Sequence, residues 1–127
     1  MHMDKQTLEK RETVELIGSD KVEGTAVYRP DGEKIGTIDR IMIDKRSGRA
    51  AYAVMSFGGF LGIGEDHYPL PWSKLDYDTR YGGYVVNVSE AELEGAPRVA
   101  RKDEWDPVDR AWERRVHDHY GVPPYWM

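Results

Sequence analysis

The chain contains no cysteine among its 127 residues. This absence excludes a thiol nucleophile, a disulfide framework and any zinc site that depends on thiolate ligands. A chain of this length can bury a real core, so it needs neither a disulfide nor a metal to fold. We therefore expect one domain with a modest extension, held together by apolar packing.

Long apolar runs and positive charge are also scarce. No run approaches the roughly 20 apolar residues of a membrane helix, so we expect no membrane insertion. The formal net charge is −5, which disfavours nucleic-acid binding, because that binding needs a basic face. This balance is ordinary for a cytoplasmic protein, and we expect a cytoplasmic location.

Catalytic and metal-binding patterns are missing as well. No serine stands in the strand-to-helix context of a nucleophile elbow. His117 and His119 are two residues apart on a predicted helix, where side chains point apart, so they cannot share a metal ion. We interpret both as cations favoured by the helix dipole at its C-terminal end. The sequence predicts no enzymatic activity, no cofactor and no metal.

The pattern between residues 25 and 88 is one of short strands and turns. The strand expected at residues 67–72 should lie at an edge of the sheet. Pro69 and Pro71 lack the backbone N–H groups that a central strand donates to its neighbours. Short strands with turns every 8–12 residues or so predict a small closed or nearly closed sheet. The predicted strands are Ala26–Tyr28, Lys34–Asp44, Ala50–Phe57, His67–Trp72 and Tyr84–Val88.

Several local signals refine this pattern. Asp31 and Gly32 follow a proline and predict a tight turn. Gly36 predicts a bend or bulge inside its strand. Residues 18–20 interrupt the apolar segment before them. Ser89 with Glu92 forms a capping-box pattern, which predicts one helical turn.

The glycine-rich stretch 58–64 permits more than one interpretation. A phosphate-binding loop requires a helix directly after the glycines, but prolines follow instead, and the Lys-Ser/Thr pair of a P-loop is missing. A wide hairpin is the favoured interpretation, because glycines allow positive φ and close backbone approach. Phe60, Leu61 and Ile63 then either fold back over the end of the barrel or stand exposed as a binding patch.

The segment after about residue 100 differs in kind. Asp106 is a suitable N-cap, Pro107 suits the first helical position, and Gly121 suits the position after the helix. Apolar residues between them recur at helical spacing, which predicts an amphipathic helix of three to four turns or so.

Large aromatic side chains are concentrated in this extension. Burying one such side chain stabilises a fold by about 1.5–3 kcal/mol, so we expect these rings to cover an apolar surface. That surface is either the chain's own barrel or a second copy, which would give a dimer. The rings belong to Trp105, Trp112, Tyr120, Tyr125 and Trp126.

The block from residue 19 to residue 98 resembles the PRC-barrel family. The resemblance rests on the order and spacing of D-K-V-E-G-T-A-V-Y (20–28), D-G-E-K-I-G-T-I-D (31–39), G-G-F-L-G-I-G (58–64) and Y-P-L-P-W (68–72). It implies a small all-β barrel of about six strands. The family includes the cytoplasmic part of the photosynthetic reaction-centre H subunit, the C-terminus of a bacterial ribosome-maturation factor, and small stand-alone proteins. This chain is similar to a stand-alone bacterial member with a C-terminal α-helical extension.

These observations predict three segments: a flexible arm at 1–13, a PRC-barrel-like domain at 14–99, and a helix with an aromatic tail at 100–127. We expect a non-enzymatic interaction module that self-associates as a homodimer and docks a protein partner. Its expected contacts are Phe60, Leu61, Ile63 and the five aromatic residues of the extension. The alternatives are a small-ligand-binding barrel, or an RNA- or ribosome-associated barrel that uses the basic residues Arg40, Lys45, Arg46 and Arg49.

Overall fold

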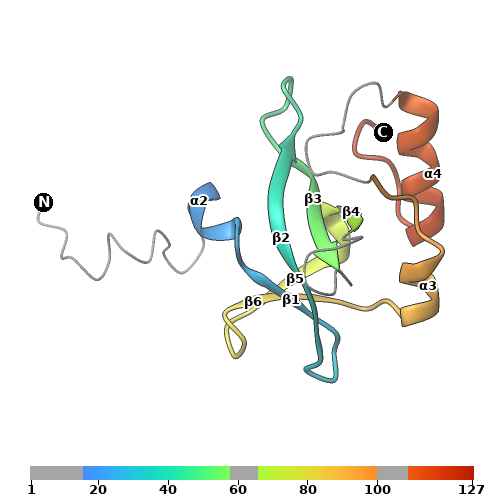
Figure 1. Cartoon of the computed structure of the whole chain (residues 1–127). Helices are drawn as coiled ribbons and strands as arrows, with labels where there is room; N and C mark the ends of the chain where they lie inside the picture. Colours follow the sequence, from blue (N-terminus) through green and yellow to red (C-terminus); the bar gives the residue numbers. More distant parts are fainter. Residues whose placement is uncertain (1–15, 58–65, 100–108) are drawn as a thin grey trace, which may run out of the picture.

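The computed structural model describes residues 16–57, 66–99 and 109–127 of the chain (Figure 1). None of the helices in these ranges combines the length and the apolar character that a membrane crossing requires. In chain order, the elements are α2 (Ser19–Val22), β1 (Ala26–Tyr28), β2 (Lys34–Ile43), β3 (Ala50–Phe57), β4 (Asp66–Pro71), the 3₁₀ helix η1 (Trp72–Lys74), β5 (Leu75–Asp78), β6 (Gly83–Val86), α3 (Glu90–Glu94) and α4 (Arg110–Tyr120).

The six strands form one mixed sheet in the order β4-β3-β2-β1-β6-β5. Neighbouring strands are antiparallel except β1 and β6, which run parallel. The sheet curls into a half-barrel (Figure 1). The predicted all-β sheet of about six strands is confirmed, although β5 was not among the strands expected from the sequence.

Strand β4 lies at one end of the sheet, as its two prolines predicted. It pairs with β3 along one side. On its other side, the backbone of His67 exchanges hydrogen bonds of 3.0 and 2.9 Å with that of Val99. The chain that follows α3 therefore covers part of this edge, which protects it from pairing with another strand.

Two short helices flank the sheet in sequence. The capping box of α3 is confirmed: the Ser89 hydroxyl accepts a hydrogen bond from the Glu92 N–H (3.0 Å), and the Glu92 carboxylate accepts one from the Ser89 N–H (3.3 Å). Helix α2 corrects the sequence analysis, which treated residues 18–20 as a break. The backbone N–H groups of Lys21 and Val22 donate to the Gly18 carbonyl, so one helical turn forms there.

The C-terminal helix α4 ends where the sequence predicted but begins later. Gly121 has φ of 68°, the left-handed conformation expected after the helix. The predicted start at Asp106 and Pro107 is wrong, because α4 begins at Arg110. Its N-cap is Asp109, which is extended and accepts a hydrogen bond from the Trp112 N–H at 2.9 Å. Two aspartates three residues apart both suit an N-cap, and the sequence does not distinguish them.

One core joins the sheet to the C-terminal extension. Val116 and Tyr120 of α4 are buried together with side chains from the strands and from α3, and α4 packs against β4 (Figure 1). The extension therefore covers the chain's own sheet, which is one of the two surfaces that the sequence analysis left open. The most deeply buried apolar members of the core are Val27, Ile38, Ala53, Met55, Leu70, Val86, Leu93 and Val116.

Gly36 marks a close approach between two strands. The pairing of β1 with β2 shifts register beside it, since Val27 is opposite Gly36 while Tyr28 is opposite Lys34. The predicted irregularity is therefore confirmed. A Cβ atom at this position would collide with the Ser56 carbonyl oxygen and would lie 2.7 Å from the Met55 side chain. The glycine lets β2 and β3 pack at this distance.

We predict that Gly36→Ala lowers the free energy of unfolding by about 2–3 kcal/mol, because the backbone of β3 must shift to admit a methyl group. Urea titration followed by circular dichroism measures this difference. Gly48→Ala is the matched control. Its added Cβ meets no atom within 4 Å, and the residue has φ of 75°, so its cost is the left-handed strain of about 1–2 kcal/mol alone. Equal losses in both variants would contradict the close-approach argument.

Candidate functional site

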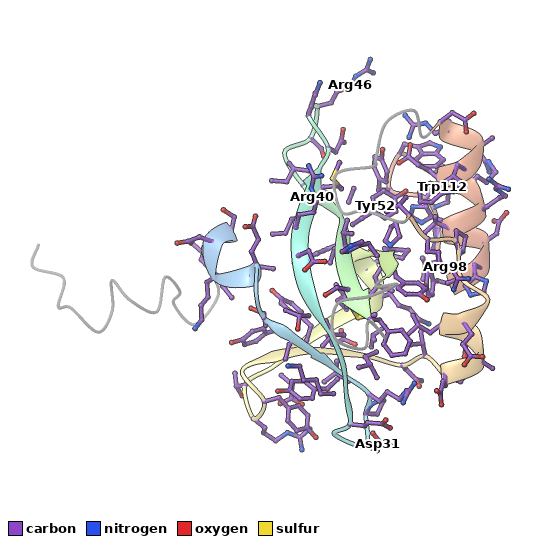
Figure 2. All side chains as sticks on the ribbon, in the orientation of Figure 1. Asp31, Arg40, Arg46, Tyr52, Arg98 and Trp112 are labelled. Atoms are coloured by element: carbon purple, nitrogen blue, oxygen red, sulfur yellow. The ribbon has the colours of Figure 1, made fainter. Side chains whose placement is uncertain are left out.

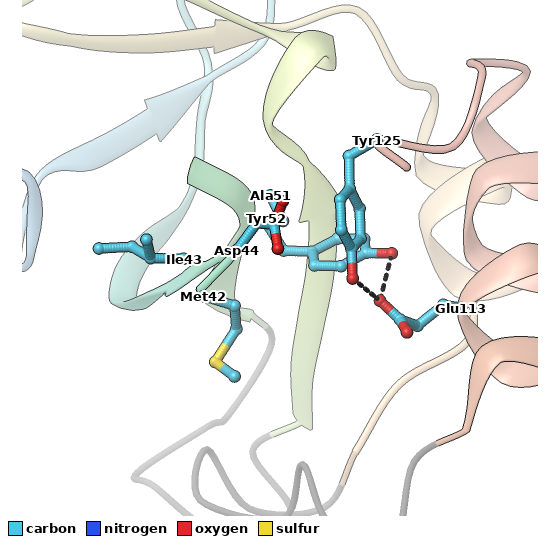
Figure 3. Close-up of a pocket in the computed structure, with 7 residues that line it drawn as sticks. All are labelled: Met42, Ile43, Asp44, Ala51, Tyr52, Glu113 and Tyr125. Carbon is cyan, nitrogen blue, oxygen red and sulfur yellow. Dashed lines mark hydrogen bonds between the residues drawn. The ribbon is translucent and has the colours of Figure 1, made fainter. Parts of the chain in front are cut away.

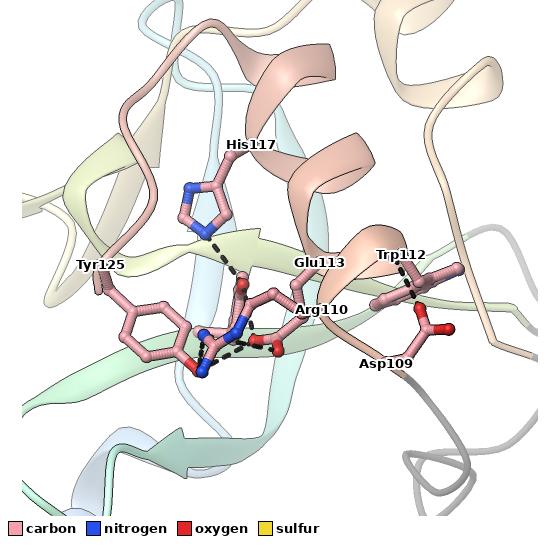
Figure 4. A network of polar contacts seen from close by, with 7 residues as sticks. Asp109, Arg110, Trp112, Glu113, His117 and Tyr125 are labelled. Carbon is pink, nitrogen blue, oxygen red and sulfur yellow. Dashed lines mark hydrogen bonds and ion pairs between the residues drawn. The ribbon is translucent and has the colours of Figure 1, made fainter. Parts of the chain in front are cut away.

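A polar cluster joins α4 and the C-terminal tail to strand β3 (Figure 4). The Glu113 carboxylate lies at its centre. Oε1 of this group accepts one hydrogen bond from the Tyr52 hydroxyl and another from the Tyr125 hydroxyl, both at 3.0 Å. Arg110 donates to the Tyr125 oxygen at 3.2 Å, and His117 Nε2 lies 2.8 Å from the Tyr52 oxygen. We call Tyr52, Arg110, Glu113, His117 and Tyr125 the clasp.

The local sequence explains how the clasp forms. Arg110, Glu113 and His117 are three or four residues apart, so they share one face of α4. After α4, the left-handed Gly121 reverses the chain, and the Val122 N–H donates to the His117 carbonyl at 3.1 Å. The tail consequently returns along the same face of the helix, where Tyr125 meets Glu113.

Aromatic contacts strengthen this return of the tail. The Tyr125 ring meets the Tyr52 ring edge-on, with centroids 5.6 Å apart and an interplanar angle of 88°. The Arg110 guanidinium lies 4.0 Å from the centroid of the Trp126 ring. A cation this close to an indole face is attracted to it by the ring quadrupole. The last aromatic residues of the chain therefore pack on its own helix.

His117 is buried inside the clasp, with 2% of its surface exposed. Burial lowers the pKa of its ring, although Glu113 and the backbone at 122–123 favour the charged form. Its Nδ1 atom makes no hydrogen bond of good geometry within the described residues. His117 is therefore not the helix-terminal cation expected from the sequence, because it is buried, and burial lowers its pKa despite the nearby charge of Glu113.

Burial also determines the protonation state of Tyr52, the clasp tyrosine on strand β3. Desolvation, followed by the nearby Glu113 charge, raises the pKa of Tyr52 far above its ordinary value. Its hydroxyl therefore stays protonated and can donate to Glu113 at any physiological pH.

Two hollows share Tyr125 as a lining residue. The first has a volume of about 90 Å³ and opens beside β2 and β3 (Figure 3); we call it the clasp hollow. The second, of about 180 Å³, lies toward η1 and is lined partly by Trp72, His117 and Pro123. Ile43 and Tyr125 at the clasp hollow remain 55% and 36% exposed. The clasp hollow is lined by Met42, Ile43, Asp44, Ala51, Tyr52, Glu113 and Tyr125.

The predicted contact residues fall into three groups. Phe60, Leu61, Ile63 and Trp105 lie outside the described residues, so their predicted role stays a prediction. Trp112 of α4 packs against the core (Figure 2). Tyr120 is a member of that core. Tyr125 belongs to the clasp, and Trp126 packs on the helix beside it.

The basic residues that the sequence grouped together are divided by the structure. Lys45, Arg46 and Arg49 are exposed in the turn between β2 and β3, whereas Arg40 is half-buried within β2. In Figure 2, Arg46 lies at the far end of this hairpin and Arg40 lies along the strand. We call residues 45–49 the hairpin tip. It is held by Asp44, which accepts hydrogen bonds from the Arg46 N–H (3.2 Å) and the Ser47 hydroxyl (2.8 Å).

The sequence analysis missed Tyr52, Glu113 and Ile43 as site residues. The spacing of Arg110, Glu113 and His117 could have indicated a polar helix face. Nothing in the sequence pairs that face with Tyr52, which is 61 residues away from Glu113. Likewise, His67 Nδ1 meets Asp39 Oδ2 at 2.8 Å across the sheet, a contact that depends on strand register.

Comparison with known proteins gives one family result. A model of the PRC-barrel domain matches residues 15–93. No curated protein matches the chain. The matched range includes Tyr52 and the β2–β3 hairpin, whereas the α4 and tail residues of the clasp follow it. The clasp thus joins a barrel strand to an extension beyond the family match.

We predict that Glu113→Ala lowers the free energy of unfolding by about 2 kcal/mol, because two hydroxyls lose a charged acceptor in a mostly buried position. Chemical denaturation at pH 7 measures the change. Glu94→Ala, an exposed glutamate at the end of α3, is the matched control and should stay within about 0.5 kcal/mol of the parent chain. An equally small effect for Glu113→Ala would show that the clasp does not hold the extension.

We predict that folding stability falls as pH decreases below about 6.5, the ordinary pKa of histidine. Because the folded pKa of His117 is lowered, the unfolded chain binds the proton more readily in this range, and stability is lost on acidification. Urea unfolding at several values between pH 5.5 and 7.5 measures the slope. His117→Phe should reduce it, because the ring that takes up the proton is then absent. An unchanged slope in His117→Phe would refute the assignment to this ring.

Proposed function

Since the chain belongs to the PRC-barrel domain family, we propose that it is a non-enzymatic interaction module that self-associates and docks a protein partner. The family is generally non-catalytic, which supports the first part. Fold alone does not determine function, so the remaining support must come from the surface of this chain. We place the module in the bacterial cytoplasm, in agreement with its acidic composition.

The hydrogen bonds that the clasp residues make to one another support a structural role for these residues. Glu113 Oε1 receives both tyrosine hydroxyls, and the buried His117 lies against Tyr52. These are the groups whose chemistry would otherwise suggest acid–base work. Here they attach α4 and the tail to the sheet, and we infer that they serve to shape the neighbouring surface.

The observation that carries the proposal is the apolar surface beside the clasp hollow. Ile43 is 55% exposed and Tyr125 is 36% exposed, and both line the same hollow. A single exposed apolar residue is ordinary on a protein surface. An exposed isoleucine and tyrosine around a hollow form the kind of apolar, aromatic surface that interfaces use. We call Met42, Ile43 and Tyr125 the Ile43 surface.

The position of α4 limits the form of self-association. Val116 and Tyr120 are already buried against the chain's own core. Exchange of this helix between copies would need that core to open. We therefore propose a side-by-side homodimer through the Ile43 surface. Phe60, Leu61 and Ile63 remain the proposed contacts for a further protein partner.

We predict that Ile43→Asn weakens self-association, because an interface centred on the Ile43 surface would have to bury an unpaired amide. Sedimentation velocity over a range of protein concentrations measures the equilibrium. The matched control is Leu16→Asn, which changes a 74% exposed leucine near α2. A parent chain that is monomeric at every concentration would refute self-association, and equal behaviour of both variants would refute the Ile43 surface.

A further inference from the structure

The second hollow beside the clasp is large enough for one small ring. Its volume is about 180 Å³. A cavity of about 150 Å³ can hold benzene, whereas sites for drug-sized ligands measure roughly 300–1,000 Å³. The hollow therefore limits a guest to a single ring with one small substituent. We call it the Trp72 hollow, and the residues that line it include Ala50, Pro71, Trp72, His117, Pro123 and Tyr125.

The walls of the Trp72 hollow are mainly rings. Trp72 and Tyr125 supply aromatic rings, and Pro71 and Pro123 supply saturated ones. Both aromatic side chains have fixed neighbours: Trp72 meets Tyr84 edge-on with centroids 5.4 Å apart, and Tyr125 belongs to the clasp. Aromatic pairs are more stable than their buried area alone accounts for, so these walls favour an aromatic guest.

One buried polar atom beside this hollow lacks a partner. His117 lines the hollow and is 2% exposed, and its Nδ1 atom has no hydrogen-bond partner within the described residues. In Figure 4, Nε2 points toward the clasp and Nδ1 points toward the returning tail, where Pro123 forms part of the wall. A buried polar atom without a partner leaves its loss of hydration uncompensated.

The hydrogen bonds of the clasp determine what kind of group Nδ1 requires. The Tyr52 hydroxyl has one hydrogen, which it donates to Glu113 Oε1 at 3.0 Å. The contact of 2.8 Å between His117 Nε2 and the Tyr52 oxygen then needs a hydrogen on Nε2. Burial lowers the pKa of His117, which favours the neutral ring. A neutral ring with its hydrogen on Nε2 has a bare acceptor at Nδ1.

The neighbouring backbone does not supply a donor for this acceptor. The groups of Val122 and Pro123 near the ring favour its charged form, as carbonyl oxygens do, and a carbonyl cannot donate. The Val122 N–H already donates to the His117 carbonyl at 3.1 Å, and a proline has no N–H. A hydroxyl group on a guest would supply the missing donor.

We propose that the Trp72 hollow binds a small phenol, a compound with one aromatic ring and one hydroxyl group. The ring packs against Trp72 and Tyr125, and the hydroxyl donates to His117 Nδ1. Because Nδ1 is itself covered, the hydroxyl reaches it by a small outward displacement of the tail at Pro123. This site goes beyond the proposed interaction module and does not require self-association.

The first experiment titrates the full chain with phenol and, separately, with toluene at pH 7.5. The Trp72 indole N–H and the Ser73 amide are followed by NMR. The two probes have the same number of non-hydrogen atoms, but only phenol can donate a hydrogen bond. We expect saturable shifts with phenol and a Kd about fivefold tighter than that of toluene, the gain from one hydrogen bond. No saturable shift with phenol, or equal affinities, overturns the proposal.

A cavity-filling variant locates the binding. Ala50→Leu places a larger side chain in the hollow and should weaken phenol binding by about tenfold or more, because the guest and the new side chain need the same space. The matched control is Ala91→Leu at an exposed position on α3, which should keep the affinity of the parent chain. Phenol binding that survives Ala50→Leu overturns the assignment to this hollow.

The hydrogen bond to His117 has its own test. His117→Phe replaces the acceptor with an apolar ring, so the preference for phenol over toluene should disappear, and circular dichroism checks that the variant is folded. A preference that remains in the folded variant overturns the contact with Nδ1. Anisole provides the same test in the parent chain, because it has the ring and the oxygen but no donor. Anisole should bind no tighter than toluene, and an affinity equal to that of phenol overturns the contact.

Discussion

The arrangement of α4 and the C-terminal tail depends on the hydrogen bonds that the Glu113 carboxylate accepts. Its Oε1 atom accepts one hydrogen bond from the Tyr52 hydroxyl on strand β3 and another from the Tyr125 hydroxyl in the tail, so a single acidic group joins α4 both to the distant strand and to the tail that follows the helix. Apolar packing of Val116 and Tyr120 supplies the burial that holds α4 to the sheet. The carboxylate fixes the orientation of the two tyrosine side chains, because hydrogen bonds to an ionised group are short and geometrically demanding.

The same arrangement sets the chemistry of its surroundings. Burial lowers the pKa of His117 and raises the pKa of Tyr52, which favours the uncharged form of both groups at neutral pH. This matters for the neighbouring surface, since Tyr125 is held by Glu113 and Arg110 at the edge of the hollow. A hollow with fixed aromatic walls loses less conformational entropy on binding than one whose walls must first be ordered.

The β2–β3 hairpin links this surface to association. Its base carries Met42, Ile43 and Asp44 beside the clasp, and its tip carries exposed cations. A family match that covers the barrel strands does not extend to α4 or the tail. The hollow is therefore formed by the barrel strands and the extension together. The proposed association depends on both parts.

The sequence by itself determined the local elements and the family to which the chain belongs. Glycines, prolines and the Ser89–Glu92 pair predicted the turns, the edge strand and α3, because these depend on backbone geometry within a few residues. The helix start was misplaced, since Asp106 and Asp109 are equally good caps in isolation. Only the tertiary structure decided that Tyr52 meets Glu113, that His117 is buried, and that the aromatic tail covers its own helix. These outcomes depend on which distant surfaces meet and exclude water, which no local pattern encodes.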